Sequence, residues 1–351
     1  MGFVFAADTH LCNRNIKKQR TMTGDSLRSF RQILKYAAER TSSLVLGGDV
    51  FDNPRPDPQA VVDYVSLTEE YGVEIFFITG QHDSRERPWA LTSRWATHMD
   101  PNTTYNIGNV NVRGLDWAPD GIADRIRDHG PKGMVFVGHQ VWQEFNYGVP
   151  EASLAELPSI YELALVGDYH VFKSRRIGRT ASDTTGIRVF RPGSISVMSI
   201  NEPSEKQFLW VDEQGLDISI ERLETRRLIR DYVGTSSAHP DDDLHRIGVT
   251  LKDLEEEDWK PMLHVSYNPE VEDCVKRIRS VVGNNAHLWL KDVSIEEEYE
   301  GGQATEIIMS NDIIEKAIAK QLSGEELSMA LQLWQSADMK HELEIIGGIS
   351  P

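Results

Sequence analysis

Imidazole and carboxylate side chains recur along this sequence in short clusters next to glycine. Such side chains hold first-row divalent metal ions, and the glycines let the backbone turn sharply. One cluster alone is weak evidence, because an Asp-x-His is more often a turn with a surface histidine, and a buried histidine is more often a hydrogen-bonded core residue. Five clusters in succession favour a metal site. They are Asp8-Thr9-His10, Gly47-Gly48-Asp49-Val50-Phe51-Asp52, Gly80-Gln81-His82-Asp83, Gly138-His139-Gln140 and Gly167-Asp168-Tyr169-His170.

Each cluster follows an apolar run of strand length. In the first half, strand-type and helix-type patterns alternate as β-α-β-α-β, which predicts a largely parallel sheet covered by helices. Ligands bind beyond the carboxyl ends of parallel strands, so the five clusters should converge at one edge of one sheet. The predicted strands are Phe3–Ala7, Ser43–Leu46, Val73–Thr79, Tyr105–Ile107, Val110–Val112, Gly133–Val137 and Leu163–Val166, and the predicted helices are Ser26–Arg40 and Pro58–Tyr71.

The composition is that of a globular protein. Of 351 residues, 40% are hydrophobic and 26% charged, which excludes a disordered chain, a collagen and a disulfide-stapled miniprotein. No apolar run reaches about 18 residues, so no membrane span is expected. The apolar N-terminal stretch lacks a basic leader and reads as a buried strand, not a signal peptide. With two cysteines, Cys12 and Cys274, a reducing, cytoplasmic setting is expected.

The net charge of -18 is unevenly distributed. Residues 231–351 carry 10 basic and 25 acidic side chains, whereas residues 1–230 carry 27 and 30. This shift suggests a domain boundary near residue 230. Beyond a loop at residues 236–243, the segments Met262–Tyr267, Val271–Val281 and Ala286–Lys291 read as strand, helix and strand. We therefore expect a first domain at 1–230, a small α+β domain at 231–295, and at 296–351 a linker followed by a helical hairpin.

The series of clusters resembles the calcineurin-like metallophosphoesterases. Within that superfamily the chain looks like the SbcD/Mre-type nuclease subunit of the double-strand-break repair complex, over residues 3–203. The closer resemblance rests on Gly48-Asp49-Val50-Phe51-Asp52, on His139-Gln140 and on Arg191-Pro192-Gly193-Ser194-Ile195-Ser196. It implies an α/β fold, a β-sandwich flanked by helices. The small domain and the hairpin resemble the family's capping domain and ATPase-binding tail only in order and type.

By position, the resemblance implies two divalent metal ions bridged by Asp49. Such a pair can clamp the attacking and leaving oxygens of a phosphodiester. His82 falls where the family places a non-ligand histidine that can protonate the leaving oxygen, with Asp83 beside it to orient the ring. The implied ligands are Asp8, His10 and His170 for one ion, and Gln81, His139 and Asp168 for the other.

Two ligand positions depart from the family pattern, which has Asn at Gln81 and His at Asp168. Glutamine keeps a carbonyl donor on a longer side chain, and the aspartate replaces a neutral imidazole with a charged, harder oxygen. Three carboxylates then favour Mn²⁺, with Mg²⁺ as the second choice. We interpret the changes as retuning of the site; loss of the second metal ion is the alternative.

DNA contacts must come from the nearly neutral N-terminal part. Basic residues are expected in loops beside the metal ligands, where a phosphate backbone would run. Each of them taken singly is more simply a solvated surface charge. The candidates are Arg14, Lys17, Lys18, Arg20, Arg85, Arg87, Lys173, Arg175, Arg176 and Arg179.

The amphipathic tail, Asn311–Trp334, has two readings of equal weight. In the first, it packs on its own domain. In the second, it docks on the coiled coil of an SbcC-type ATPase. The helices at Ser26–Arg40 and Pro58–Tyr71 could supply a homodimer face, as in the family.

Together these features indicate a metal-dependent DNA nuclease, an exonuclease with endonuclease activity as an option, within an SbcCD-type repair and recombination complex. One alternative is a phosphoesterase for small molecules or phosphoproteins. Another is an inactive DNA-end scaffold that holds an ATPase on DNA.

Overall fold

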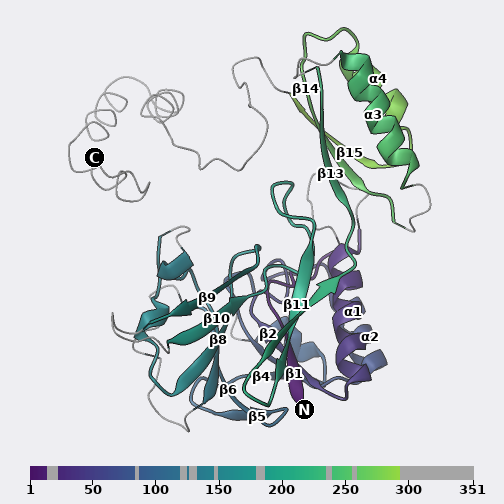
Figure 1. Cartoon of the computed structure of the whole chain (residues 1–351). Coiled ribbons are helices and arrows are strands. Elements are labelled where there is room, and N and C mark those ends of the chain that lie inside the picture. The colour runs from purple at the N-terminus through teal and green to yellow at the C-terminus, as the bar shows by residue number, and fades with distance from the viewer. Residues whose placement is uncertain are drawn as a thin grey trace, which may run out of the picture. The chain divides into compact units, whose positions relative to one another are not determined.

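The computed structural model describes residues 1–13, 23–83, 87–118, 125, 133–145, 149–178, 186–234, 239–254 and 259–292 (Figure 1). The chain divides into a compact unit, residues 1–296, and a second unit, residues 297–351. The second unit lies outside the described residues, and so do the expected linker and helical tail.

A six-stranded sheet forms the first layer of β-structure, in the order β12-β11-β1-β2-β3-β4. Neighbours from β1 to β4 are parallel, and β11 and β12 join antiparallel beside β1. The strands are β1 Gly2–Ala6, β2 Ser43–Gly47, β3 Ile75–Ile78, β4 Ala96–His98, β11 Lys206–Asp212 and β12 Ile218–Leu223.

The second sheet also has six strands, in the order β5-β6-β7-β8-β10-β9. Its four central strands are parallel, and the two edge strands pair antiparallel. The strands are β5 Tyr105–Ile107, β6 Val110–Leu115, β7 Met134–His139, β8 Tyr161–Gly167, β9 Lys173–Ile177 and β10 Ile187–Arg191.

Alternation along β1 shows how the layers pack. Phe3 and Phe5 face the second sheet and lie in one buried cluster with Val135 and Leu163. Val4 and Ala6 point to the other side, toward the helices. Successive side chains of a strand alternate between faces, so a strand buried on both faces reads as a continuous apolar run.

Two helices cover the outer face of the first sheet (Figure 1), α1 Asp25–Glu39 and α2 Pro58–Tyr71. The Asp57 side chain accepts a hydrogen bond from the Gln59 amide and caps the start of α2, and Gly72, with φ 60°, caps its end. Short 3₁₀ turns span Trp89–Thr92, Gln143–Phe145 and Leu154–Glu156. The predicted α/β sandwich flanked by helices is confirmed. Among the described residues, no helix has both the length and the apolar character needed to cross a bilayer.

One prediction about the clusters is wrong. Three of them follow β1, β2 and β3 in the first sheet, but the other two follow β7 and β8 in the second. The apolar runs before the clusters do not distinguish the sheets, because parallel strands in either sheet are buried on both faces.

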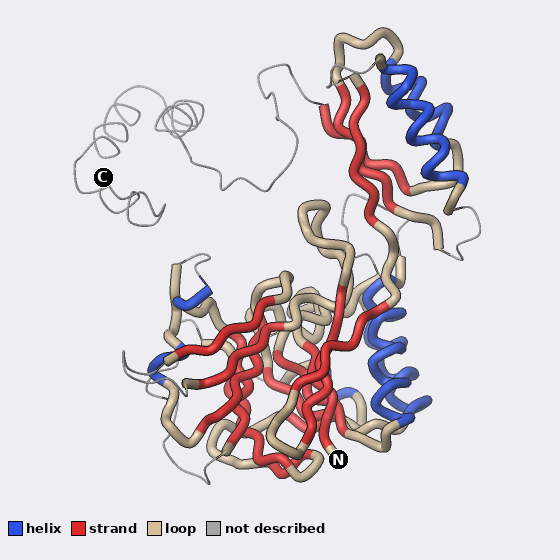
Figure 2. Tube along the Cα trace, in the orientation of Figure 1, coloured by secondary structure: helices blue, strands red, loops and turns tan. Residues whose placement is uncertain are grey.

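A separate sheet of three parallel strands, in the order β13-β14-β15, follows the sandwich. Figure 2 shows its two helices on one face of the strands. The elements are β13 Leu228–Val233, α3 Pro240–Lys252, β14 Met262–Tyr267, α4 Cys274–Val282 and β15 His287–Asp292. Strand β13 runs across residue 230.

The prediction of a loop at residues 236–243 is wrong for residues 240–243, because α3 begins at Pro240. Proline suits the first turn of a helix, and three aspartates, Asp241, Asp242 and Asp243, occupy that turn. Negative charge there is favoured by the helix dipole.

Candidate metal centre

The chain segments that leave β1 and β2 run side by side. The His10 amide donates to the Asp49 carbonyl over 2.9 Å, and the Asp8 amide donates to the Gly48 carbonyl over 3.2 Å. Asp8, His10 and Asp49 have φ of 50°, 40° and 50°, a left-handed conformation that costs energy for residues with a Cβ. The turns bring three buried candidate ligands together at the strand ends.

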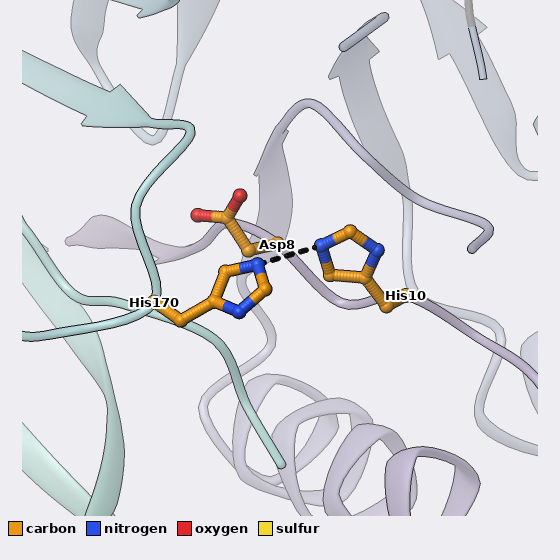
Figure 3. A group of neighbouring side chains, drawn as sticks. All are labelled: Asp8, His10 and His170. Atoms are coloured by element: carbon orange, nitrogen blue, oxygen red, sulfur yellow. Dashed lines mark hydrogen bonds between the residues drawn. The ribbon is translucent and has the colours of Figure 1, made fainter. Parts of the chain in front are cut away.

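Asp8, His10 and His170 form one group (Figure 3). His10 Nε2 lies 3.0 Å from His170 Nε2. His170 Nδ1 lies 2.8 Å from Glu202 Oε1, so Nδ1–H donates to this carboxylate and the Nε2 lone pair faces His10. Two nitrogens bound at about 2.1 Å to one ion, at a right angle, are about 3.0 Å apart. The group therefore fits a cation.

A second group comprises Asp8, Asp49 and His139. His139 Nδ1 lies 2.7 Å from the Gly47 carbonyl, so Nδ1–H donates there and Nε2 faces the carboxylates. His139 Nε2 lies 3.3 Å from Asp49 Oδ2 and 3.9 Å from Asp8 Oδ1. Asp8 and Asp49 carry negative charge into the protein interior, where a cation would neutralise it.

Gln81 and Asp168 lie next to this second group. The Gln81 Nε2–H donates to Asp168 Oδ1 over 2.7 Å, and the Asp168 amide donates to Asp8 Oδ1 over 3.1 Å. Gln81 Oε1 is buried without a hydrogen-bond partner among the described residues. An unsatisfied buried carbonyl oxygen is costly, and a metal ion would satisfy it.

Glycines make room for the centre. A Cβ on Gly80 would lie 2.1 Å from Asp49 Oδ1, and a Cβ on Gly48 would lie 2.4 Å from His139 Nδ1. Gly48 also has φ 90°, which favours glycine. Any side chain at these positions would displace a candidate ligand.

The electrostatics show that the groups need a positive charge between them. Burial raises the pKa of Asp8 to about 6 and lowers the pKa of His10 to about 3. Burial also acts against protonation of His139, yet the Asp49 and Asp8 carboxylates raise its pKa to about 10. Without a cation, a proton is held where the carboxylates meet; a divalent ion would replace it.

Short contacts thus join all seven candidate ligands, and the donor set of carboxylates, imidazoles and one amide oxygen fits divalent metal ions. The structure brings together Asp8, His10, Asp49, Gln81, His139, Asp168 and His170.

The two candidate catalytic residues have different surroundings. The His82 backbone amide donates to Asp49 Oδ1 over 2.8 Å. The His82 side chain is 44% exposed, and its Nε2 lies 4.0 Å from Asp49 Oδ2. The ring Nδ1 lies 2.9 Å from the Asp52 carbonyl. Asp83 accepts instead from the Gly80 and Val50 amides, over 2.8 and 2.6 Å. The expectation that Asp83 orients His82 is therefore corrected: Asp52 does so, and Asp83 holds the turn.

Two functional neighbours were missed in the sequence. Glu202, 32 residues after His170, contacts its ring, and Lys206 contacts Glu202. No motif marks this pair, and only the fold brings it to the site. Asp52 does carry a signal, because it ends the Gly48–Asp52 motif, and its Oδ1 lies 3.6 Å from His10 Nδ1.

The basic candidates are only partly described. Lys173, Arg175 and Arg176 are exposed on β9, the edge strand of the second sheet, not in a loop as expected. Their charges mark an edge strand, which proteins protect in this way from further pairing. Arg87 is exposed after the third cluster. Outside the described residues lie Arg14, Lys17, Lys18, Arg20, Arg85 and Arg179.

Comparison with curated proteins finds relatives named DNA double-strand break repair protein Mre11. That of Methanosarcina acetivorans is 24% identical over 246 residues, 64% of this chain and 39% of the relative. That of Methanosarcina mazei is 23% identical over 248 residues, 64% and 38% of the two chains. That of Methanococcus maripaludis is 22% identical over 342 residues, 86% and 90% of the two chains.

The matched region thus spans about two fifths of the length of the two Methanosarcina relatives. No family model matches the chain. The α/β sandwich and the three relatives agree with the motifs. The resemblance to the Mre11/SbcD-type metallophosphoesterases is therefore confirmed.

Proposed function

We propose that the chain is a metal-dependent DNA nuclease, an exonuclease with endonuclease activity as an option, in an SbcCD-type repair complex. The observation that carries the proposal is the approach of His10 and His170 through their Nε2 atoms beside Asp8. The Mre11 relatives support DNA as the substrate.

The chain's own residues would hold two divalent ions, Mn²⁺ before Mg²⁺. Asp8, His10 and His170 would hold one, and Gln81, His139 and Asp168 the other, with Asp49 between them. When bound, divalent ions supply Lewis-acid activation of a phosphodiester and of water. Three carboxylates in the donor set favour these hard cations.

His82 would act as the general acid. In its protonated form, Nδ1–H donates to the Asp52 carbonyl over 2.9 Å, which fixes the ring and leaves Nε2–H to donate. The ring is 44% exposed, and Nε2 lies 4.0 Å from Asp49, so it borders both solvent and the centre. If this proton is transferred to the leaving oxygen, the leaving group departs as an alcohol and not as an alkoxide.

The proposed partners are DNA, an ATPase and a second copy of the chain. Exposed Lys173, Arg175 and Arg176 would contact DNA phosphates from β9. The C-terminal tail would dock on an SbcC-type ATPase, and α1 and α2 would supply a homodimer face. The proposed division is a nuclease domain at 1–230, a capping domain at 231–295 and a partner-binding tail from 296.

An assay on end-labelled duplex DNA with Mn²⁺ tests the activity, with Asp49→Ala as the inactive control. We expect cleavage by the wild type and none by the variant. Faster hydrolysis of a p-nitrophenyl ester than of DNA would favour a small-molecule phosphoesterase. Tight DNA binding without cleavage, unchanged by His82→Ala, would favour a scaffold.

A further inference from the structure

A buried ion pair lies next to His170. Glu202 is in the segment that precedes β11, and Lys206 is the first residue of that strand. Lys206 Nζ lies 2.7 Å from Glu202 Oε2, and the two side chains are 2% and 10% exposed. Removing two charges from water is expensive, and a buried pair often stabilises a fold no better than apolar residues of similar volume. This pair therefore calls for a role other than stability.

The two oxygens of Glu202 have different partners. Oε1 accepts from His170 Nδ1–H over 2.8 Å. Oε2 accepts from Lys206 Nζ over 2.7 Å and from the Met198 amide over 3.1 Å. Hydrogen bonds to Oε2 therefore fix the carboxylate in place, while Oε1 accepts from the imidazole.

Lys206 reaches the backbone of the same histidine. Its Nζ donates to Ser194 Oγ over 2.8 Å and to the His170 carbonyl over 3.4 Å. The ion pair thus contacts His170 at the ring through Glu202 and at the main chain through Lys206.

The segment that carries Glu202 is also held from the small sheet. Arg230, on β13, donates to the Ile200 carbonyl over 2.7 and 3.0 Å and to the Glu202 carbonyl. Glu202 therefore accepts hydrogen bonds both at its carboxylate and at its backbone carbonyl, which fixes its position.

We propose that Glu202 is a positioning residue for His170 and that Lys206 holds Glu202 in place; this rests on the proposed metal centre. By accepting Nδ1–H, Glu202 leaves the lone pair on Nε2, the atom that faces His10 at 3.0 Å. Carboxylates that accept the second N–H of a metal-binding histidine fix its tautomer and ring orientation, and their loss weakens metal binding about 10- to 100-fold.

Mn²⁺ titration of the full chain, followed by electron paramagnetic resonance of the free ion, provides the first test. We expect Glu202→Ala to weaken binding about 10- to 100-fold and Glu202→Gln, whose amide oxygen still accepts, to weaken it less. The matched control is Glu205→Ala, which removes an exposed neighbouring carboxylate and should leave binding unchanged.

Glu202→Ala leaves Lys206 buried without its counter-ion and could unfold the chain. The double variant Glu202→Ala/Lys206→Met removes both charges, and thermal unfolding checks that it folds. We expect this folded double variant to bind Mn²⁺ as weakly as Glu202→Ala. Binding equal to the wild type would overturn the proposal, because the pair would then serve stability alone.

A second readout needs no metal. Long-range ¹H–¹⁵N spectra of the histidine rings at pH 8, assigned with His170→Gln, distinguish the two neutral tautomers. We expect Nδ1–H for His170 in the wild type and a tautomer mixture in the double variant; Nδ1–H in both would overturn the proposal. A wild type that binds no Mn²⁺ would refute the proposed metal centre, and these spectra would still decide whether Glu202 sets the tautomer.

Discussion

His10 Nε2 lies 3.0 Å from His170 Nε2, although 160 residues separate the two histidines. Two lone pairs at that distance repel each other unless a proton or a cation lies between them. His170 Nδ1–H already donates to Glu202. The His170 Nε2 lone pair is therefore free to accept a proton from His10 Nε2–H or, once His10 gives up that proton, to bind the same cation as His10.

Metal removal should destabilise the folded chain. Mn²⁺ at 100 times its dissociation constant should stabilise it by about 2.7 kcal/mol per site, because it offsets the buried carboxylates of Asp8 and Asp49. Thermal unfolding with Mn²⁺ and with EDTA measures the difference. The Asp49→Asn variant should lose most of the difference in melting temperature between Mn²⁺ and EDTA. A wild-type melting temperature that is the same with Mn²⁺ and with EDTA would contradict the proposed metal centre.

His82→Ala should slow cleavage without releasing metal. Removal of a general acid costs about 10²- to 10⁴-fold in rate, and His82 is not among the seven proposed ligands. Single-turnover cleavage and Mn²⁺ stoichiometry separate the two effects. A lower stoichiometry in the variant would mean that His82 is a ligand instead.

Asp83→Asn should change how the stability of the metal-free chain depends on pH. Burial raises the pKa of Asp83 from 3.8 to about 7, so between those values the folded state keeps a proton that the unfolded state has lost. The wild type therefore loses stability relative to Asp83→Asn as pH rises from about 4 to about 7, by on the order of a few kcal/mol.

Urea unfolding in EDTA at a series of pH values measures this difference. The control is Asp217→Asn, because the Asp217 side chain is 86% exposed and its substitution should give no such trend. A gap between wild type and Asp83→Asn that stays constant with pH would contradict the prediction. A constant offset is expected in addition, since asparagine cannot accept from both the Gly80 and Val50 amides.

Asp168→His tests the departure from the family pattern. If the aspartate retunes a competent site, both proteins bind two Mn²⁺ per chain, and the imidazole lowers Mg²⁺-supported cleavage relative to Mn²⁺-supported cleavage. Metal analysis and paired assays measure both quantities. A rise from one ion to two on substitution would show that the natural chain has lost the second ion.

Lys173→Ala should weaken DNA binding and lower the slope of log affinity against log salt by about 0.9, the loss of one phosphate contact. Lys173 lies three residues after His170, whereas Arg176 points to the opposite face of β9, and Arg176→Ala should act less. Lys35→Ala, a 66% exposed lysine on α1, is the control. An unchanged slope for Lys173→Ala would remove β9 from the DNA contact.

The sequence predicted the first half of the sandwich well, because apolar runs end in Asp8, Asp49 and Gln81 at the ends of parallel strands. It could not assign β7 and β8 to a second sheet, since apolar periodicity carries no information on which sheet a strand joins. Strand β9, from Lys173 to Ile177, was missed because its first four residues are all exposed, so the strand lacks the alternation of apolar and polar side chains.

Tertiary contacts account for what remained hidden at the site. Glu202 reaches His170 across 32 residues, and nothing in the intervening sequence specifies that contact. Asp83 shows the opposite case. Because it follows His82 directly in the sequence, we expected it to orient the His82 ring, but its carboxylate accepts from the Gly80 and Val50 amides instead.

The division of the ligands between two sheets has a consequence during synthesis on the ribosome. A nascent chain that has emerged to residue 100 contains Asp8, His10, Asp49 and Gln81 but not His139, Asp168 or His170. Three of the seven candidate ligands are then still missing, so the fragment cannot assemble the complete ligand set. Under the proposed function, hydrolytic capacity arrives late in translation, once the second layer has closed on the first.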